Sequence, residues 1–575
     1  MLRSRRAAFP LALLAASLTT AVASAASLKP VAAEHGMVVT AQHLATEAGV
    51  AVLRGGGNAV DAAVAVGYAL AVVYPAAGNI GGGGFMTIRL ADGRQTFLDF
   101  RETAPLAATR DMYLDGNGAS IAGLSLDGYR AVAVPGSVAG FEYARQRYGT
   151  FGRARLLAPA IGLARRGFLL EQGDVDLLSL ANEDLRRDAP SAAVFLPNGA
   201  PLKVHERLVQ TDLARSLKLI AEQGPAAMYR GSVGAAIVAA SERSNGILSQ
   251  ADFQRYEVRE LPPIECDYRG FHIVSAPPPS SGGVIVCEIL RILEAYPLRE
   301  LGFHSAQAVH YEIEAMRHAY VDRNFRLGDP SFVQNPVHEL LDEQHIGRIR
   351  AAIDPARAGD PDTVKPGAAP HEGENTTHFS IADRYGNAVA VTYTLNRAFG
   401  ARVMAAGTGV LLNDEMDDFA TNLHAPNLSG LVQGENNAVA PGKRPLSSMS
   451  PTIVSRDGVP VLVIGTPGGS RIITAVVQTI VNLIDYRMNI QEAIDAPRFH
   501  QQWQPQSTEV ENFAFSPDTR QILLRMGHLL GQPPPLTHAT GILIGAPGVD
   551  SSPIPPYRFF GANDPRLGTG LALGY

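Results

Sequence analysis

Residues 374–396 read ENTTHFSIADRYGNAVAVTYTLN, and this stretch predicts a β-hairpin. The segments 376–383 and 387–396 are rich in β-branched and aromatic residues, which pack well on a pleated surface. Between them, residues 384–386 fit a three-residue loop, because Gly386 can adopt the left-handed conformation that the last loop position requires. The sequence therefore predicts two adjacent antiparallel strands.

Pairing of Asp383 with Asn387 would set the register of this hairpin and place Thr376 opposite Thr394. Because side chains alternate between the two faces of a strand, one face collects polar residues. They are Thr376, His378, Ser380, Thr392, Thr394 and Asn396. A core should not leave polar groups unpaired, so the residue pattern alone favours an edge hairpin whose polar face meets water.

Three blocks in and after the hairpin carry a family resemblance: NTTH at 375–378, GNAVAVT at 386–392 and NDEMDDF at 413–419. They closely resemble the γ-glutamyltransferases (γ-glutamyltranspeptidases), which are N-terminal-nucleophile hydrolases. The likeness recurs from about residue 30 to Tyr575. It implies an α+β fold, a four-layer αββα sandwich of two stacked, mainly antiparallel sheets flanked by helices.

The resemblance also implies a precursor that cuts itself between Asn375 and Thr376. Residues 26–375 would become a large subunit and residues 376–575 a small subunit, which together form one intertwined catalytic domain. Residues 352–374 are rich in Pro, Gly, Asp and Ala and are typical of a flexible, exposed segment. Such a segment would leave the new amino terminus open to substrate.

The first 25 residues have the pattern of a secretory signal peptide. Several arginines precede an apolar stretch, and small residues follow at 23–25. The apolar run falls short of the roughly 20 residues that a membrane span needs, which makes a membrane anchor the weaker interpretation. We therefore expect a periplasmic or secreted protein without a membrane anchor once the signal peptide is removed.

Composition is that of a globular protein, with 46% hydrophobic and 18% charged residues in a chain of 575. The net charge of −6 comes from interspersed charges and argues against nucleic acid as a partner. Cys266 and Cys287 could pair in an oxidising compartment, and two buried thiols are an equally good interpretation.

No segment has the ligand spacing of a zinc or EF-hand site, so we expect no metal and no other cofactor. His304, His310 and His318 fall on one predicted helix. No acidic residue is identified at ligand spacing from them, and they are interpreted as ordinary surface or packing histidines.

Helical composition or periodicity predicts helices at 41–53, 58–74, 138–148, 155–166, 282–294 and 304–325. A strand is expected within 407–412, and another at 461–465. Gly468 and Gly469 then lead into a helix that ends near Tyr486. Backbone N–H groups at a helix start suit a developing oxyanion, although a tight strand-to-helix turn explains the same pattern equally well.

The resemblance assigns substrate-binding roles to several residues. Arg101, in DFRETAP, matches the arginine that grips the substrate's α-carboxylate, a role that suits a bidentate guanidinium. Ser447 and Ser448 match further donors to this carboxylate. The residues that match binders of the α-amino group are Glu415, Asp418 and Asn396, and two carboxylates suit an ammonium ion.

These roles suit a two-step acyl transfer. The Thr376 hydroxyl would attack the γ-amide carbon with its own α-amine as base, because the pKa of an α-amine is near neutrality. Thr394 would orient the hydroxyl, and Gly468 and Gly469 would hold the oxyanion. The ester would pass to water or to the amine of an amino acid or peptide, and glutathione is the donor that the family implies.

Two alternatives remain. A glutaryl or cephalosporin acylase of the same superfamily uses the same kind of nucleophile, and Glu415 and Asp418 argue against it because its substrate lacks the α-amino group. The other is an exported amino-acid-binding protein that never matures. Ser429, in a predicted lid loop at 420–440, stands where a bacterial relative has a tyrosine, so aromatic gating of the pocket is in doubt.

Overall fold

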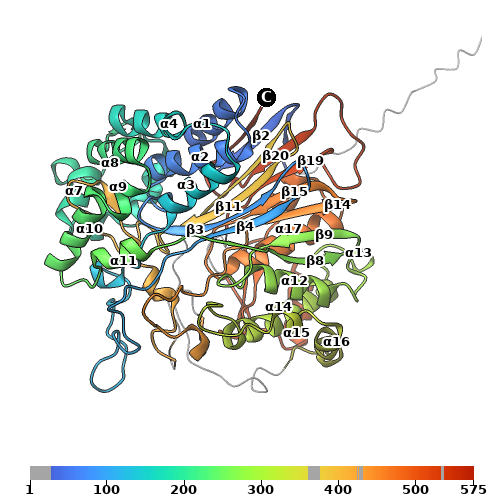
Figure 1. Ribbon diagram of the computed structural model, residues 1–575. Helices are drawn as coiled ribbons and strands as arrows, with labels where there is room; N and C mark the ends of the chain where they lie inside the picture. Colours follow the sequence, from blue (N-terminus) through green and yellow to red (C-terminus); the bar gives the residue numbers. More distant parts are fainter. Residues whose placement is uncertain (1–26, 360–375, 424, 426–430, 533–536) are drawn as a thin grey trace, which may run out of the picture.

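The computed structural model describes residues 27–359, 376–423, 425, 431–532 and 537–575 (Figure 1). The predicted signal peptide (1–25), Asn375 at the predicted cleavage site and Ser429 of the predicted lid lie outside these residues.

In the described part of the chain, two seven-stranded sheets form the centre, and every strand pairing within them is antiparallel. The first sheet has the order β21 (Leu571–Gly574), β2 (Gly36–Thr40), β10 (Thr376–Asp383), β11 (Ala388–Thr394), β3 (Gly83–Arg89), β4 (Gln95–Phe100) and β7 (Arg259–Leu261). The second has the order β1 (Val31–Ala33), β20 (Phe559–Asn563), β19 (Thr540–Ile544), β15 (Val459–Gly465), β14 (Thr452–Arg456), β9 (Phe271–Ser275) and β8 (Ile264–Tyr268).

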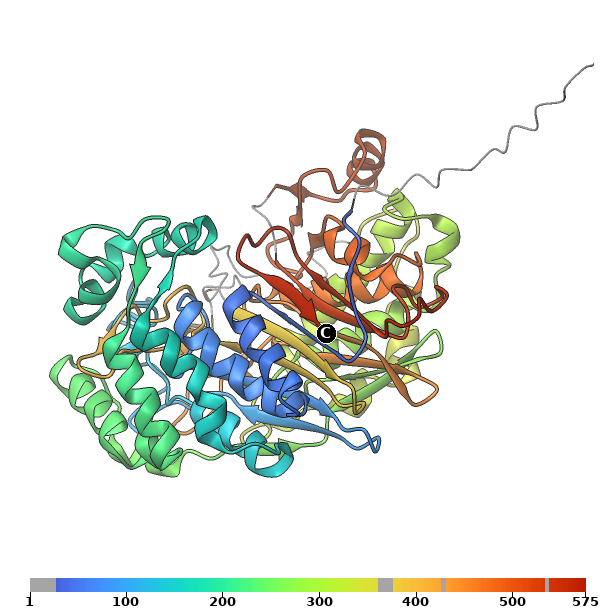
Figure 2. The ribbon, with the colours of Figure 1, turned by 90° about the horizontal axis from the view of Figure 1, so that it is seen from above.

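Helices cover the outer face of each sheet, the blue, teal and green helices on one side and the yellow-green and orange ones on the other (Figure 2). The first layer contains α1 (His43–Arg54), α2 (Ala59–Val73), α3 (Ser137–Tyr148), α4 (Arg153–Arg166) and α8 (Thr211–Gln223). The second contains α12 (Gly282–Leu293), α14 (Ala306–Arg326), α16 (Glu343–Ala352), α17 (Arg471–Ile484) and α18 (Ile490–Asp495). This arrangement confirms the predicted αββα sandwich.

The described chain contains further α-helices and short strands. The helices are α5 (Gln172–Ser179), α6 (Asn182–Leu185), α7 (Ala189–Phe195), α9 (Ala226–Tyr229), α10 (Ser232–Arg243), α11 (Gln250–Arg255), α13 (Leu298–Leu301), α15 (Val337–Leu340) and α19 (Pro517–Arg525). The strands are β5 (Phe168–Leu169), β6 (Arg207–Leu208), β12 (Met404–Ala405), β13 (Val410–Leu411), β16 (Phe499–His500), β17 (Thr508–Val510) and β18 (Leu530–Gly531). Only Val410–Leu411 forms a strand within the predicted segment 407–412.

The core is divided among the layers. Apolar side chains of β2 and β11 meet those of β14, β15 and β19 between the two sheets, with Val39, Val463 and Ile542 among them. Helix α2 is buried along its whole length, as its nearly continuous apolar sequence predicts. Asn58 and Asp61 form the capping box that fixes its start.

The hairpin has the predicted register, with Thr376 opposite Thr394, and Gly386 has a φ of 99°. Its predicted position at a sheet edge is wrong, because β10 and β11 lie between β2 and β3 and are buried throughout. Its polar face instead forms hydrogen bonds inside the sandwich. His378 Nδ1 lies 2.7 Å from Thr392 Oγ1, and Ser380 Oγ donates to the Thr540 carbonyl at 3.1 Å.

Segments before and after residue 376 alternate within both sheets. In the first sheet β10 and β11 insert between β2 and β3, and in the second sheet the four strands from β20 to β14 lie between β1 and β9. Cutting the chain at residue 376 would therefore leave two pieces that share both sheets.

Cys266 of β8 and Cys287 of α12 form a disulfide bond, which resolves the alternatives that the sequence left open. Among the described residues, no helix combines the length and the apolar character needed to cross a membrane.

Candidate active site

A pocket lies where β10 begins and β11 ends, and it gathers residues from distant parts of the chain. The predicted site residues that line it are Arg101, Thr376, Thr394, Asn396, Glu415, Asp418, Ser447, Ser448 and Gly469. Gly468 is the sequence neighbour of Gly469 and lies in the turn between β15 and α17. The fold therefore brings the predicted residues of the described chain to one place.

Two threonine hydroxyls face each other at this pocket. Thr376 Oγ1 donates to Thr394 Oγ1 at 3.3 Å, and the backbone N–H of Asn396 donates to the same Thr394 oxygen at 2.8 Å. Asn396 has a φ of 81°, in the left-handed region that asparagine tolerates better than most residues. The hairpin register and this turn together fix the orientation of the hydroxyl pair.

A cluster of buried charges forms another part of the pocket. One terminal nitrogen of Arg101 is hydrogen-bonded to Glu415 and the other to Asp418. A carboxylate oxygen of Glu102 lies 3.8 Å from Arg101 Nη1. The side chains of Arg101 and Glu415 are essentially inaccessible, whereas that of Asp418 is 18% exposed. The group assigned to the α-carboxylate is thus in contact with the groups assigned to the α-amine.

Burial and the charge of the ion-pair partner act in opposite directions on the pKa values of Glu415 and Arg101. Burial raises the pKa of Glu415 well above its usual range, although the positive charge of Arg101 opposes the shift. Burial would lower the pKa of Arg101, but the carboxylates of Glu415 and Asp418 outweigh it and raise that pKa. In a zwitterionic α-amino acid the ammonium and carboxylate groups are attached to the same carbon. A pocket that places cationic and anionic groups side by side therefore complements it.

Arg323, on α14, is a pocket residue that the sequence analysis missed. Its Nη2 donates to Ser448 Oγ at 2.9 Å and its Nη1 to Asn324 Oδ1 at 3.0 Å. Among the described residues, no carboxylate lies within ion-pair distance, and burial lowers its pKa to about 10. No motif surrounds Arg323, so its position in the pocket becomes evident only from the packing of α14.

The glycines between β15 and α17 adopt backbone conformations that other residues rarely take. Gly468 and Gly469 have φ values of 127° and 55°. The carbonyl of Gly468 accepts from the N–H of Arg471, the first residue of α17, at 3.0 Å. Gly469, Ser470 and Ile472 line the same pocket as the two threonines, so the start of this helix lies beside them.

We expect Arg323→Gln to raise KM for an α-amino-acid donor by ~10-fold or more, because a charge-assisted hydrogen bond contributes about 1.5–3 kcal/mol. Arg326→Gln on the same helix is the matched control, since Arg326 pairs with Glu339 and Asp322 and does not line the pocket. Steady-state kinetics with melting temperatures of both variants provide the measurement. Equal KM values for the two variants would show that Arg323 does not contribute to binding of the donor.

Comparison with known proteins gives a consistent result. A family model described as Gamma-glutamyltranspeptidase matches residues 45–572. The chain is 63% identical over 570 residues to a glutathione hydrolase proenzyme of Pseudomonas sp. (strain A14), covering 99% of each chain. It is 46% identical to the glutathione hydrolase proenzyme of Escherichia coli K12 (95% of this chain, 93% of that one). An Acylase ACY 1 proenzyme of Pseudomonas sp. (strain V22) is 40% identical (88% and 89%).

Solved structures include both functional types. A cephalosporin acylase from Bacillus halodurans has a TM-score of 0.82 at 26% identity, covering 97% of this chain and 98% of that chain. The γ-glutamyltranspeptidase of Helicobacter pylori has a TM-score of 0.55 at 42% identity, covering 58% of this chain and 96% of that chain. With the family model and the relatives of highest identity in agreement, the chain belongs to the γ-glutamyltranspeptidase family.

Proposed function

We propose that this protein is a γ-glutamyltransferase that cleaves the γ-glutamyl amide of glutathione and related compounds, after cutting itself before Thr376. The observation that carries the proposal is the placement of the Thr376–Thr394 hydroxyl pair in one pocket with Arg101, Glu415 and Asp418. A nucleophile and an α-amino-acid-binding site are thus adjacent. Relatives named glutathione hydrolase proenzymes support glutathione as the donor.

In this mechanism the Thr376 hydroxyl attacks the γ-carbonyl carbon while its freed α-amine accepts the proton. The carbonyl oxygen gains negative charge opposite the backbone N–H groups of Gly468 and Gly469. The C–N bond then breaks, the leaving amine takes the proton, and a γ-glutamyl ester of Thr376 remains. Water, or the amine of an amino acid or peptide, attacks this ester and regenerates the free threonine.

His378, two residues after the nucleophile, is a poor candidate for the base. It is fully buried between Thr392 and Ser380, and burial lowers its pKa to about 3. A general base works best when its pKa is near the working pH. The threonine's own α-amine suits that requirement better.

Recognition of the donor follows from the charges around the pocket. The α-carboxylate would bind on the side of Arg101 and the serines 447 and 448, which Arg323 supports through Ser448. The α-amine would bind near Glu415 and Asp418, where the partly exposed Asp418 carboxylate is open to a ligand.

Several observations support maturation into two associated chains. The pieces 26–375 and 376–575 would share both sheets, which would hold them together after the cut. The H. pylori chain is 96% covered but matches only 58% of this chain. A large subunit of residues 26–375 would make up a similar share of this chain. The word proenzyme in the names of the relatives agrees. The buried disulfide supports an oxidising, periplasmic or extracellular location.

The acylase alternative makes a different claim about the substrate, so paired donors separate the two functions. γ-Glutamyl-p-nitroanilide and glutaryl-p-nitroanilide differ only in the α-amino group. We expect kcat/KM to favour the γ-glutamyl compound by roughly 30-fold to several thousand-fold, because a lost partner of a buried charge costs about 2–5 kcal/mol. Release of p-nitroaniline is the measurement, and equal rates or a preference for the glutaryl compound would contradict the proposal.

A further inference from the structure

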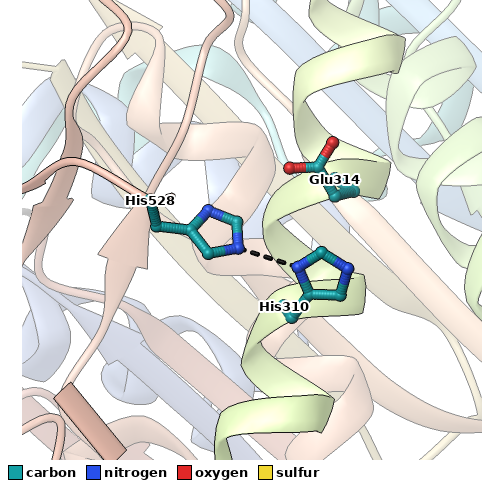
Figure 3. Close-up of side chains that lie close together, drawn as sticks. All are labelled: His310, Glu314 and His528. Carbon is teal, nitrogen blue, oxygen red and sulfur yellow. Dashed lines mark hydrogen bonds between the residues drawn. The ribbon is translucent and has the colours of Figure 1, made fainter. Parts of the chain in front are cut away.

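Two histidines and a glutamate converge where α14 meets the segment after α19 (Figure 3). His310 and Glu314 lie one turn apart on α14, and His528 reaches them from 218 residues away in the sequence. One potential ligand atom from each residue lies within 4.8 Å of the other two, and all three side chains are buried. The expectation that no acidic residue stands at ligand spacing from the histidines of α14 was therefore wrong.

The ring nitrogens of His310 are in the state that a metal ligand requires. Its Nε2 lies 2.7 Å from the carbonyl oxygen of Asp354, which can only accept, so Nε2 carries the proton. Metal-bound histidines commonly donate their outer N–H to a backbone carbonyl in this way. The Nδ1 of His310 therefore accepts, and the donor is His528 Nε2 at 2.8 Å. Metal binding would replace this hydrogen bond and shift the His528 proton to Nδ1, a nitrogen that has no hydrogen-bond partner among the described residues. In the second histidine cluster described below, a guanidinium opposes such a shift.

Glu314 supplies an oxygen that lacks a hydrogen bond. Its Oε2 accepts from the N–H of Gly359 at 3.2 Å, whereas its Oε1 is buried, has no hydrogen-bond donor among the described residues and forms an ion pair with Arg317 Nη2 at 3.5 Å. The ion pair with Arg317 is thus the contact that balances the charge of this buried oxygen, and a metal ion could take the place of the guanidinium. His528 Nε2 and His310 Nδ1 are the neighbouring groups through which such a cation could also be held.

We propose that His310, Glu314 and His528 form a site for a divalent transition metal of the zinc type. Two imidazoles and one carboxylate match the ligands that zinc takes, with a fourth position left for water. The two histidine nitrogens would have to move apart to roughly 3.3 Å, the separation that tetrahedral bonds of about 2.0–2.1 Å impose. Arg317 competes with the ion for Glu314, so replacing it with methionine should tighten binding.

The site would also link the two chains. His310 and Glu314 precede residue 376, and His528 follows it. If the proposed self-cleavage occurs, the ion would connect the large and the small subunit at a point away from the catalytic pocket. This linking role rests on the proposed function, whereas metal binding does not.

A second cluster, Glu288, Asp322 and His345, in which Asp322 is only half-buried, does not carry the same proposal. His345 Nδ1 lies 3.3 Å from an Arg348 guanidinium, which donates, so the proton lies on Nε2. That proton already serves Asp322 at 2.9 Å. All three residues also precede residue 376, so this cluster provides the matched control.

The test measures zinc bound to the purified, full-length protein after chelation, dialysis and addition of micromolar zinc chloride. We expect one zinc per molecule and a zinc-dependent rise in Tm in the wild type and in His345→Gln. His528→Gln should lower zinc affinity by at least about tenfold, since even the outer partners of metal ligands contribute that much. Donor hydrolysis should be unchanged, because none of the three residues lines the pocket.

Glu314→Gln keeps the His310–His528 hydrogen bond and serves as the second variant if His528→Gln fails to fold. Wild type without stoichiometric zinc, or zinc bound equally by His528→Gln or Glu314→Gln, would overturn the proposal and leave a histidine–histidine hydrogen bond. An uncut Thr376→Ala protein should bind zinc normally. A protein that binds zinc but does not cut itself would therefore contradict only the link between subunits. A protein that cuts itself but binds no zinc would contradict only the metal site.

Discussion

Thr376→Ala is expected to remain one uncut chain and to lose γ-glutamyl hydrolysis altogether. The substitution removes the hydroxyl that would attack the preceding peptide bond during maturation and the donor carbonyl during catalysis. The wild type should show chains of 350 residues (26–375) and 200 residues (376–575) if the signal peptide ends at residue 25. A denaturing gel and p-nitroanilide release measure the two effects.

Thr377→Val provides the matched control for this experiment. Thr377 is the next residue of β10 and is also buried, and its hydroxyl makes no hydrogen bond to any residue that the structure describes. Its side chain belongs to the opposite face of the strand, so valine should preserve both cleavage and activity. Normal cleavage of Thr376→Ala, or failure of both variants, would show that Thr376 does not have the assigned role.

The hairpin shows how far local sequence can predict structure. Its register was predictable because a short loop ending in Gly386 leaves few ways to pair the strands on either side. Its central position was not, because its neighbours β2 and β3 come from about 300 residues earlier in the chain. The polar face that suggested an edge strand forms hydrogen bonds within the hairpin and to the second sheet, and the second sheet cannot be seen in the local sequence.

The residues of the two sites also differ in how far the sequence could predict them. Arg101 and Asp418 were recognised through motifs that resemble a known family, but their direct contact depends on folding across 317 residues. Arg323 and His528 lie in no recognisable motif, and their sites become evident only from the residues that pack against them. Chemistry that is local in sequence could thus be predicted, whereas chemistry assembled by tertiary packing could not.

Asp418→Asn is expected to raise KM for γ-glutamyl-p-nitroanilide by roughly 30-fold to several thousand-fold, with a smaller change in kcat. The variant keeps the shape of the side chain and removes the negative charge that would pair with the α-ammonium group, a loss of about 2–5 kcal/mol. Asp418 is a cleaner target than Arg101, because removing Arg101 would leave the buried Glu415 carboxyl without its partner.

The neighbouring Asp417→Asn isolates the effect of position from that of charge. Asp417 accepts a hydrogen bond from Ser125 Oγ at 2.6 Å and does not line the pocket, so its KM should stay near the wild-type value. Glutaryl-p-nitroanilide supplies the second comparison, since it lacks the ammonium group and should be hydrolysed no worse by Asp418→Asn than by the wild type. Both variants should still cut themselves, because the attacking hydroxyl of Thr376 is untouched. An unchanged KM for the γ-glutamyl donor in Asp418→Asn would place the ammonium group elsewhere in the pocket and return the acylase reaction to consideration.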